Sequence, residues 1–302
     1  MKKVLIAILL LGLLPHASAD YIHWVDFRLS APVLRSALEL DMASQGGEQP
    51  LDWIDILALA AAWRGGTGVT VADTQRAAQA LRGDTPPERL PGMAGRFFSY
   101  YRAAYGAALG GLVGHFAIRR TDPQTGEAEW IPAYGLKAFS PIAAGYPWSH
   151  YPDFGAQRSY GYARPHLGND ILGALGTPIC AVEGGTVEAL GWNRYGGWRI
   201  GIRSDDRKRY YYYAHLRKDA PYAEGLAVGQ RVQAGDVIGF MGRTGYSAQE
   251  NVNNIETVHL HFGLQLIFDE SQKECDSEIW IDVYPIIELL ASHCSSVARD
   301  PQ

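Results

Sequence analysis

The segment HLHFGLQL at residues 259–266 alternates polar and apolar side chains without a break. Successive side chains of a β-strand point to opposite faces, so His259, His261, Gly263 and Gln265 share one face. Leucine and phenylalanine occupy the other face. The segment therefore predicts a strand that buries one side and turns two imidazoles toward a polar groove. A glycine beside them leaves room above the sheet for a metal and a peptide.

The rest of the second half of the sequence also has the pattern of β-strands. Short runs rich in valine, isoleucine and tyrosine, bounded by glycines, predict further strands. Alternation through Tyr211, Tyr213 and His215 places a third imidazole at a strand end, on the face of those two tyrosines. A closing helix is expected over 282–292, with its apolar residues on one side. The expected strands are 185–190, 198–202, 209–215, 236–241 and 259–267.

The first half follows a different period. Apolar residues recur at helical spacing, separated by Gly-Gly and Pro-Pro punctuation, which predicts a small helical bundle from residue 20 to about 120. The fold class expected is α+β, with a small N-terminal helical domain followed by an all-β antiparallel domain that carries a groove. The expected helices are 33–42, 53–63, 74–81 and 96–109.

The N-terminus has the form of a signal peptide. Lys2 and Lys3 precede an aliphatic run at 4–14, and Ala17-Ser18-Ala19 supplies the small residues of a cleavage site. We expect cleavage after Ala19 and a secreted protein without a transmembrane anchor. The expected organisation is a signal peptide at 1–19, a helical domain of unknown role at 20–136, a β-rich domain at 137–290 and a tail at 291–302.

Charge and cysteine content further limit the partners and the disulfides that the protein can have. With 27 Lys and Arg against 32 Asp and Glu, the formal charge is -5, which disfavours nucleic acid as a partner. Three cysteines leave at least one unpaired. Cys180 lies in an apolar run and is expected to be buried. A disulfide between Cys275 and Cys294 is left open.

Two motifs could supply metal ligands: HLGND at residues 166–170 and the HLH pair at 259–261. Each is common by chance in a chain with nine histidines. A catalytic zinc takes three ligands from His, Asp and Glu and keeps a further position for water. Two histidines and one carboxylate satisfy this rule, and spare histidines could then act as a general base or stabilise an oxyanion.

These motifs and the glycine framework between them resemble the lysostaphin-type zinc endopeptidases, also called the LytM family, which cleave peptide bonds in bacterial peptidoglycan. The similarity covers roughly residues 140–290, so the resemblance implies that the β-rich domain at 137–290 is a zinc metallopeptidase domain and that the secreted protein is associated with the cell wall. In chain order, the segments that carry it are HLGND at 166–170, GTPI at 176–179, GTV at 185–187, YAHL at 213–216, GDVIG at 235–239, GRTG at 242–245 and HLHF at 259–262.

The resemblance implies that His166, Asp170 and His261 bind Zn²⁺, and that His215 and His259 are the catalytic pair beside the metal. Which histidine is the general base stays open. All five family positions are filled, which favours an active enzyme. The resemblance also places Tyr160 where a tyrosine can help to stabilise the transition state.

Other features allow alternatives. Asn193, in the segment 191–197, could hydrogen-bond a substrate peptide or could serve an ordinary hairpin turn. The segment 245–259 is longer than usual in the family, and Gly263 stands where many relatives have glutamate. The expected partner is a stem or bridge peptide of peptidoglycan. The competing interpretation is a non-cleaving module that regulates another hydrolase, and a third adds autoinhibition by the helical half or by residues 141–160.

Overall fold

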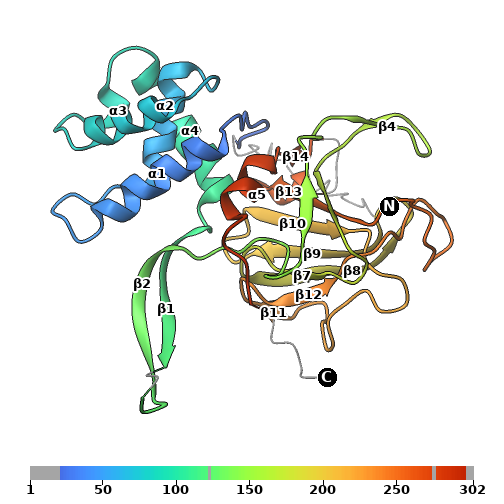
Figure 1. Ribbon diagram of the computed structural model, residues 1–302. Helices are drawn as coiled ribbons and strands as arrows, with labels where there is room; N and C mark the ends of the chain where they lie inside the picture. The colour runs from blue at the N-terminus through green and yellow to red at the C-terminus, as the bar shows by residue number, and fades with distance from the viewer. Residues whose placement is uncertain (1–20, 122–123, 274–276, 297–302) are drawn as a thin grey trace, which may run out of the picture.

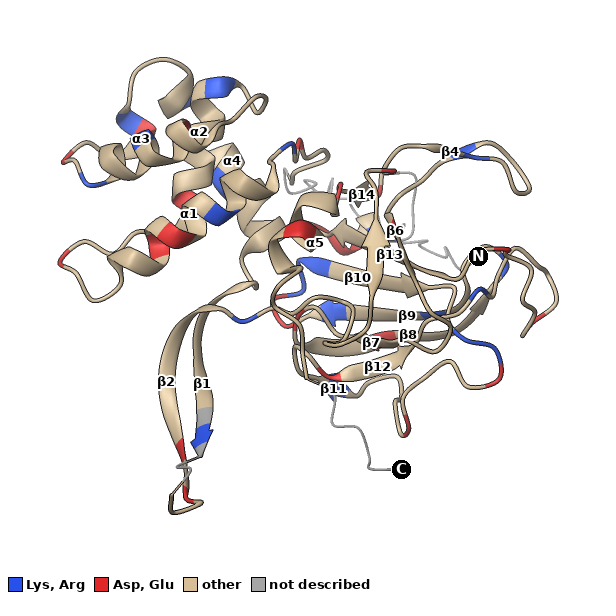
Figure 2. Ribbon diagram, viewed as in Figure 1, with Lys and Arg blue, Asp and Glu red and all other residues tan. Residues whose placement is uncertain are grey.

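The computed structural model describes residues 21–121, 124–273 and 277–296. A group of helices lies beside a β-rich part, and a two-stranded hairpin projects away from both (Figure 1). Lysines, arginines, aspartates and glutamates are scattered over the helices and the sheet (Figure 2). The α+β class expected from the sequence is confirmed, with the helices N-terminal to an antiparallel sheet.

Four helices follow the helical periodicity of the first half. Helix α2 is buried along most of its length, and it packs against both α3 and α4. Its start is fixed by Asp52, whose side chain accepts a hydrogen bond from the Ile54 amide, and its end by Gly65 in a left-handed conformation. The bounds are α1 Ala31–Ser44, α2 Trp53–Arg64, α3 Val71–Leu81 and α4 Met93–Leu109, with a 3₁₀ turn η1 at Pro87–Arg89.

The hairpin of β1 Val113–Thr121 and β2 Ala128–Leu136 was not expected from the sequence. The two strands pair antiparallel along their whole length. Ile118 and Trp130 are exposed on it, so no buried face imposes a polar and apolar alternation. The helical interpretation of residues up to about 120 is therefore wrong from residue 113 onward.

The β-rich part is built on one large antiparallel sheet with the strand order β11-β8-β9-β10-β13-β6-β3, while β14 pairs with β13. Two smaller ladders join β7 with β12 and β4 with β5. The bounds are β3 Trp148–His150, β4 Gln157–Arg158, β5 Arg164–Pro165, β6 Asn169–Gly173, β7 Pro178–Cys180, β8 Gly185–Asn193, β9 Gly197–Ser204, β10 Arg209–Ala214, β11 Arg231–Val232, β12 Val237–Phe240, β13 His259–Leu266 and β14 Ile279–Trp280.

Strand β13 has the two faces that its sequence predicts. Leu260, Phe262 and Leu264 are at most 1% exposed and form part of the core. Tyr211 and Tyr213 of β10 contact the Phe262 ring from the neighbouring strand. The opposite face of β13 carries the histidines and is available for a site.

The helical and β-rich parts are joined by a hydrogen bond from a buried, ion-paired arginine. Arg209 of β10 donates to the main-chain oxygen of Ala107 near the end of α4, at 2.7 Å. Its Nε lies 2.7 Å from a carboxylate oxygen of Glu183, which also accepts a hydrogen bond from Tyr211. Helix α5, Tyr284–Leu290, packs against α1 as a second contact between the two parts.

Several expectations fall on residues that are not described. These include the signal peptide with its cleavage site and Cys275 of the Cys275–Cys294 pair. Cys180 is fully buried, as expected. Across the described ranges, no helix has both the length and the apolar character needed to cross a bilayer.

Candidate metal centre and groove

Three side chains converge where β6 meets β13. Asp170 and His261 are opposite each other in the ladder, and His166 lies just before β6. Nε2 of His166 is 3.0 Å from Oδ1 of Asp170, and Nδ1 of His261 is 3.2 Å from the same oxygen. The two imidazole nitrogens are 2.7 Å apart. The antiparallel register thus joins two motifs that are far apart in the sequence.

The geometry of His166, Asp170 and His261 fits a metal ion. Each residue can offer one ligand atom, and these atoms lie within 4.8 Å of one another. Two imidazole nitrogens and one carboxylate oxygen form a donor set typical of catalytic zinc. These three residues are also the ligand set that the family resemblance implies.

A surrounding group of polar side chains orients these three residues. Arg158 of β4 donates to Oδ2 of Asp170 at 2.8 Å, which leaves Oδ1 facing the imidazoles. Nδ1 of His166 contacts the Asp153 main-chain oxygen at 3.1 Å. Asp153 also accepts hydrogen bonds from Arg158 and Asn169. Contacts of this kind hold a metal ligand in one orientation.

The surroundings shift the pKa values of the ligands in opposite directions. Burial alone would lower the pKa of His166, but hydrogen bonds to Asp153 and Asp170 outweigh it and raise the pKa to about 9. Burial likewise opposes ionisation of Asp170, yet its contacts with His166 and His261 hold its pKa far below the ordinary value. The site is thus strongly favourable to a negative charge on Asp170 and to a positive charge next to it.

His215 and His259 form a second pair beside the ligands. Their ring centroids are 4.7 Å apart, and the His215 ring is 5.9 Å from that of His261. Nδ1 of His215 lies 2.9 Å from the Thr244 main-chain oxygen, and Nδ1 of His259 lies 2.9 Å from that of Thr257. Protons on both Nδ1 atoms would satisfy these carbonyls, so Nε2 of each neutral ring can accept a proton.

Burial is the main cause that lowers the pKa of His215 well below its ordinary value, and the nearby His259 and His261 add to it. His215 therefore stays neutral at neutral pH. A neutral imidazole is the form required of a general base.

The expected orientation of His215 is wrong. Tyr211 and Tyr213 are buried in the core, whereas His215 lines the groove on the opposite side of the sheet. The φ angle of His215 is +62°, just after the last residue of β10. Because this left-handed conformation ends the strand alternation, the imidazole turns toward His259 and His261.

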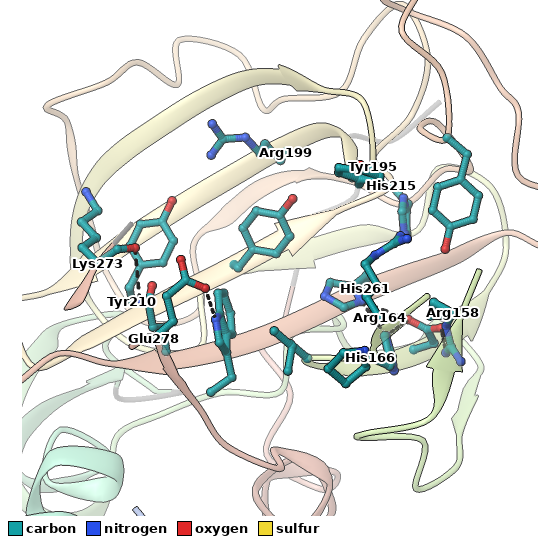
Figure 3. A pocket seen from close by; sticks show the side chains of 18 residues that line it. Arg158, Arg164, His166, Tyr195, Arg199, Tyr210, His215, His261, Lys273 and Glu278 are labelled. Carbon is teal, nitrogen blue, oxygen red and sulfur yellow. Dashed lines mark hydrogen bonds and ion pairs between the residues drawn. The ribbon is translucent and has the colours of Figure 1, made fainter. Parts of the chain in front are cut away.

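A groove with a volume of about 290 Å³ extends from these histidines along the sheet (Figure 3). Tyr210 and Tyr212 of β10 form part of its lining, and Tyr195, Tyr246 and Trp280 line it as well. The groove-lining residues all belong to the span from Arg158 to Trp280, so the helical half contributes none of the described lining. Aromatic walls of this type suit an extended peptide.

Tyr160 and Asn193 have defined contacts in the structure. The Tyr160 ring stacks on Tyr246, with centroids 4.7 Å apart. The Asn193 side chain accepts hydrogen bonds from the amides of Tyr195 and Gly196 and donates to the Tyr212 hydroxyl. These contacts support the turn interpretation of Asn193, and a direct role of either residue toward substrate stays a prediction.

Sequence reasoning did not find Asp153, Arg158 or Gly168. The first two orient Asp170 and Asn169 through contacts that depend on the tertiary fold. Gly168 has a weak signal, since it is the central residue of the HLGND motif.

Residues 164–274 match the sequence model of the family described as Peptidase family M23. The chain is 35% identical over 177 residues to the L-Ala–D-Glu endopeptidase of Bacillus subtilis (strain 168), which is 55% of this chain and 52% of that protein. It is 37% identical over 98 residues to lysostaphin of Staphylococcus simulans, or 32% of this chain and 17% of lysostaphin. The chain thus spans about half the length of the first relative and less of the second.

A solved structure from Ruminococcus gnavus ATCC 29149, named as a candidate glycyl-glycine endopeptidase lytM, superposes with a TM-score of 0.52. It is 25% identical, and the match covers 90% of this chain and 92% of that one. The fold and the histidine-carboxylate site define a metallopeptidase domain of the M23 class. This M23-type domain at residues 164–274 is similar to the lysostaphin- and LytM-type endopeptidases, as the sequence resemblance indicated.

Proposed function

We propose that this chain is an exported zinc endopeptidase that hydrolyses peptide bonds in bacterial peptidoglycan. The observation that carries this proposal is the convergence of His166, Asp170 and His261 in a groove that His215 also lines, with the His259 ring next to that of His215. Two relatives are named as an L-Ala–D-Glu endopeptidase and a glycyl-glycine endopeptidase, so both stem and bridge peptides are candidate substrates.

Zinc is the metal that best suits the donor set of His166, Asp170 and His261. Zinc held there would supply Lewis-acid activation of water and of the scissile carbonyl. Arg158 holds the second oxygen of Asp170, so this carboxylate can present Oδ1 alone. The ligand set then carries a single negative charge and leaves the metal electron-poor.

His215 and His259 would act as the general base and as the hydrogen-bond donor to the oxyanion. Each has Nδ1 directed at a main-chain carbonyl, which fixes the ring and leaves Nε2 for the reaction. One of them accepts the proton of the attacking water at Nε2. The other, once it carries a second proton at Nε2, donates a hydrogen bond to the oxyanion of the tetrahedral intermediate, and the proton taken from water passes to the leaving amine.

We also propose the domain organisation expected from the sequence, with a cleaved signal peptide at 1–19 and the peptidase domain at 137–290. The groove supports this boundary, because its lining residues belong to the span 158–280. The helical part at 20–136 contacts the peptidase part through Arg209. Edman sequencing of the exported protein would test the cleavage site, since a mature chain starting at Asp20 is expected.

The central experiment is mass spectrometry of the fragments released from purified peptidoglycan by the zinc-loaded mature chain. We expect defined peptide products that identify the cleaved bond. Asp170→Ala should abolish both zinc binding and product release, because it removes the carboxylate ligand. His215→Ala should keep its zinc, measured by elemental analysis, and lose turnover.

Matched controls are an exposed aspartate, Asp205→Ala, and an exposed histidine, His115→Ala, both outside the groove lining. Both controls should behave as the wild-type chain. Unchanged turnover in Asp170→Ala would refute the metal site. Binding of peptidoglycan without any released product would favour the non-cleaving regulator instead.

A further inference from the structure

Arg199 lies in the same row of the sheet as the metal ligands. The ladder between β9 and β10 ends at the pair Ile200–Tyr213, and Arg199 and Ala214 are the next residues on the two strands. Ala214 pairs with His261 of β13, and His261 pairs with Asp170 of β6. Since neighbouring strands are about 4.8 Å apart, the Arg199 main chain is roughly 10 Å from that of His261.

The Arg199 side chain extends over the groove side of the sheet, as Tyr210 and His261 do (Figure 3). The glycine at position 201 makes this arrangement feasible. A Cβ on Gly201 would collide with the Tyr210 ring, which crosses β9 there. Tyr210 and Arg199 therefore share one part of the groove floor.

Among the described residues, no carboxylate is paired with the positive charge of Arg199. Its Nε is shielded from solvent without a hydrogen-bond partner there, and its side chain hydrogen-bonds the neutral Tyr210 hydroxyl, which does not balance the charge. The other groove cations differ. Arg158 is paired with Asp170 and Asp153, and Lys273 is paired with Glu188 at 2.7 Å.

Arg164, the remaining groove cation, is accommodated without a carboxylate. It donates to the Tyr160 main-chain oxygen at 2.7 Å, and its guanidinium lies 4.5 Å from the centroid of the Tyr195 ring. Arg199 is thus the groove cation whose electrostatic partner is missing from the described chain. A buried donor of this kind costs free energy unless a ligand satisfies it.

Two tyrosine hydroxyls beside Arg199 add further donors. Burial raises the pKa of Tyr210 to about 12 against the opposing charge of Arg199, so its hydroxyl stays protonated. The Tyr212 hydroxyl accepts a hydrogen bond from Asn193, which leaves its proton free to donate. A guanidinium flanked by neutral phenols is a site for an anion, and a carboxylate matches its fork geometry.

We propose that Arg199 binds a carboxylate of the substrate peptide and so selects an acidic stem peptide over a bridge made of glycine alone. This inference rests on the proposed endopeptidase function. An extended peptide advances about 3.3 Å per residue. The Arg199 side chain spans part of the roughly 10 Å between its own main chain and that of His261. The carboxylate therefore belongs to a residue within about two positions of the scissile bond. Arg199 acts as a specificity residue and takes no part in the proton transfers.

The test uses two synthetic stem peptides that contain an L-Ala–D-Glu bond and differ only at the free D-Glu carboxylate, which is a carboxamide in the second. We expect the wild-type chain to prefer the carboxylate peptide by about tenfold or more in kcat/KM. Arg199→Gln should lose this preference because kcat/KM for the carboxylate peptide falls to the level of the carboxamide peptide. Arg199→Lys should retain part of the preference, because it keeps the charge but not the fork.

The matched control is Arg231→Gln, an exposed arginine paired with Asp205 outside this groove, which should keep the full preference. Thermal unfolding of each variant separates a specificity change from a folding defect. Equal rates on both peptides by the wild-type chain, or a preference that survives in Arg199→Gln, would overturn the inference.

Failure of the endopeptidase function itself would look different, because neither peptide nor pentaglycine would be cleaved. Calorimetric binding to the Asp170→Ala chain then tests Arg199 independently of turnover. Tighter binding of the carboxylate peptide, lost in the Asp170→Ala/Arg199→Gln double variant, supports the carboxylate site. Equal binding of the two peptides refutes it.

Discussion

Gly168 lies directly against the imidazole of His261. A Cβ built on Gly168 would be 2.7 Å from Cε1 of His261 and 2.6 Å from the Phe262 main-chain oxygen. Both distances are shorter than real contacts allow, and the main chain of β13 cannot move as a flexible side chain can. The glycine of the HLGND motif is therefore required so that His166 and Asp170 can approach the His261 ring.

This contact predicts a metal-binding defect in Gly168→Ala. The added methyl group should push the His261 ring away from Oδ1 of Asp170 and weaken zinc binding by about 10- to 100-fold. Competition with a fluorescent zinc chelator measures this affinity. Gly173→Ala is a useful comparison, since its Cβ would meet the flexible end of Met241 and not a ligand. A wild-type zinc affinity in Gly168→Ala would show that the His261 ring can move aside without weakening the metal site.

Zinc should also stabilise the folded chain. A ligand that binds only the native state at 100 times its dissociation constant adds about 2.7 kcal/mol to the free energy of unfolding. We expect added zinc to raise the Tm of the wild-type chain and of His215→Ala, but not of Asp170→Ala. Differential scanning calorimetry with and without a chelator measures the shift. An equal shift in all three proteins would indicate binding elsewhere.

The Arg209–Glu183 pair predicts a large loss of stability when it is broken. Arg209→Met leaves the Glu183 carboxylate without its cation and removes the donor to Ala107. Loss of one partner of a buried ion pair costs about 3–5 kcal/mol. Urea unfolding should show this decrease, whereas Arg231→Gln, at an exposed pair, should change stability by less than about 1 kcal/mol. A small effect of Arg209→Met would mean that water replaces the lost contacts.

A pH-dependent contribution is expected at the start of α3. The Asp73 carboxylate accepts hydrogen bonds from the Thr70 amide, the Thr70 hydroxyl and Arg64. Burial raises the pKa of Asp73, but these contacts outweigh it and the net shift is downward. Ionised Asp73 therefore stabilises the fold fully above its unfolded pKa of about 3.9, and this stabilisation disappears as the pH falls through the lower folded value.

Asp73→Asn tests this expectation. Its free energy of unfolding should be about 1 kcal/mol below that of the wild-type chain at pH 7, and the difference should shrink below about pH 4. Chemical denaturation at several pH values gives the comparison, with the exposed Asp84→Asn as the control. If the difference in the free energy of unfolding between the two proteins did not change with pH, the effect would come from altered hydrogen-bond geometry and not from the charge of Asp73.

The faces of β13 could be predicted from the sequence because its alternation matches a strand with one buried side. The same argument failed at His215. Its left-handed backbone conformation ended the alternation, and no sequence pattern predicts that conformation at this position. The β1–β2 hairpin was missed because exposed Ile118 and Trp130 remove the alternation that marks a half-buried strand. The roles of Arg158 and Asp153 could not be predicted from the sequence because only folding brings their partners close to them.

Gly263 provides the last prediction, because the contacts around it leave no room for a side chain. A Cβ on Gly263 would lie 2.8 Å from the Trp280 ring and 2.9 Å from the Leu167 main-chain oxygen. Gly263→Ala should therefore displace Trp280, which lines the groove, and raise KM more than it lowers kcat. In Trp280→Ala the ring is absent, so adding Gly263→Ala should cost less there. A double-mutant cycle on the free energy of unfolding should give a coupling of about 1 kcal/mol or more. Additive effects would show that Leu167 alone excludes the methyl group and that Trp280 moves freely.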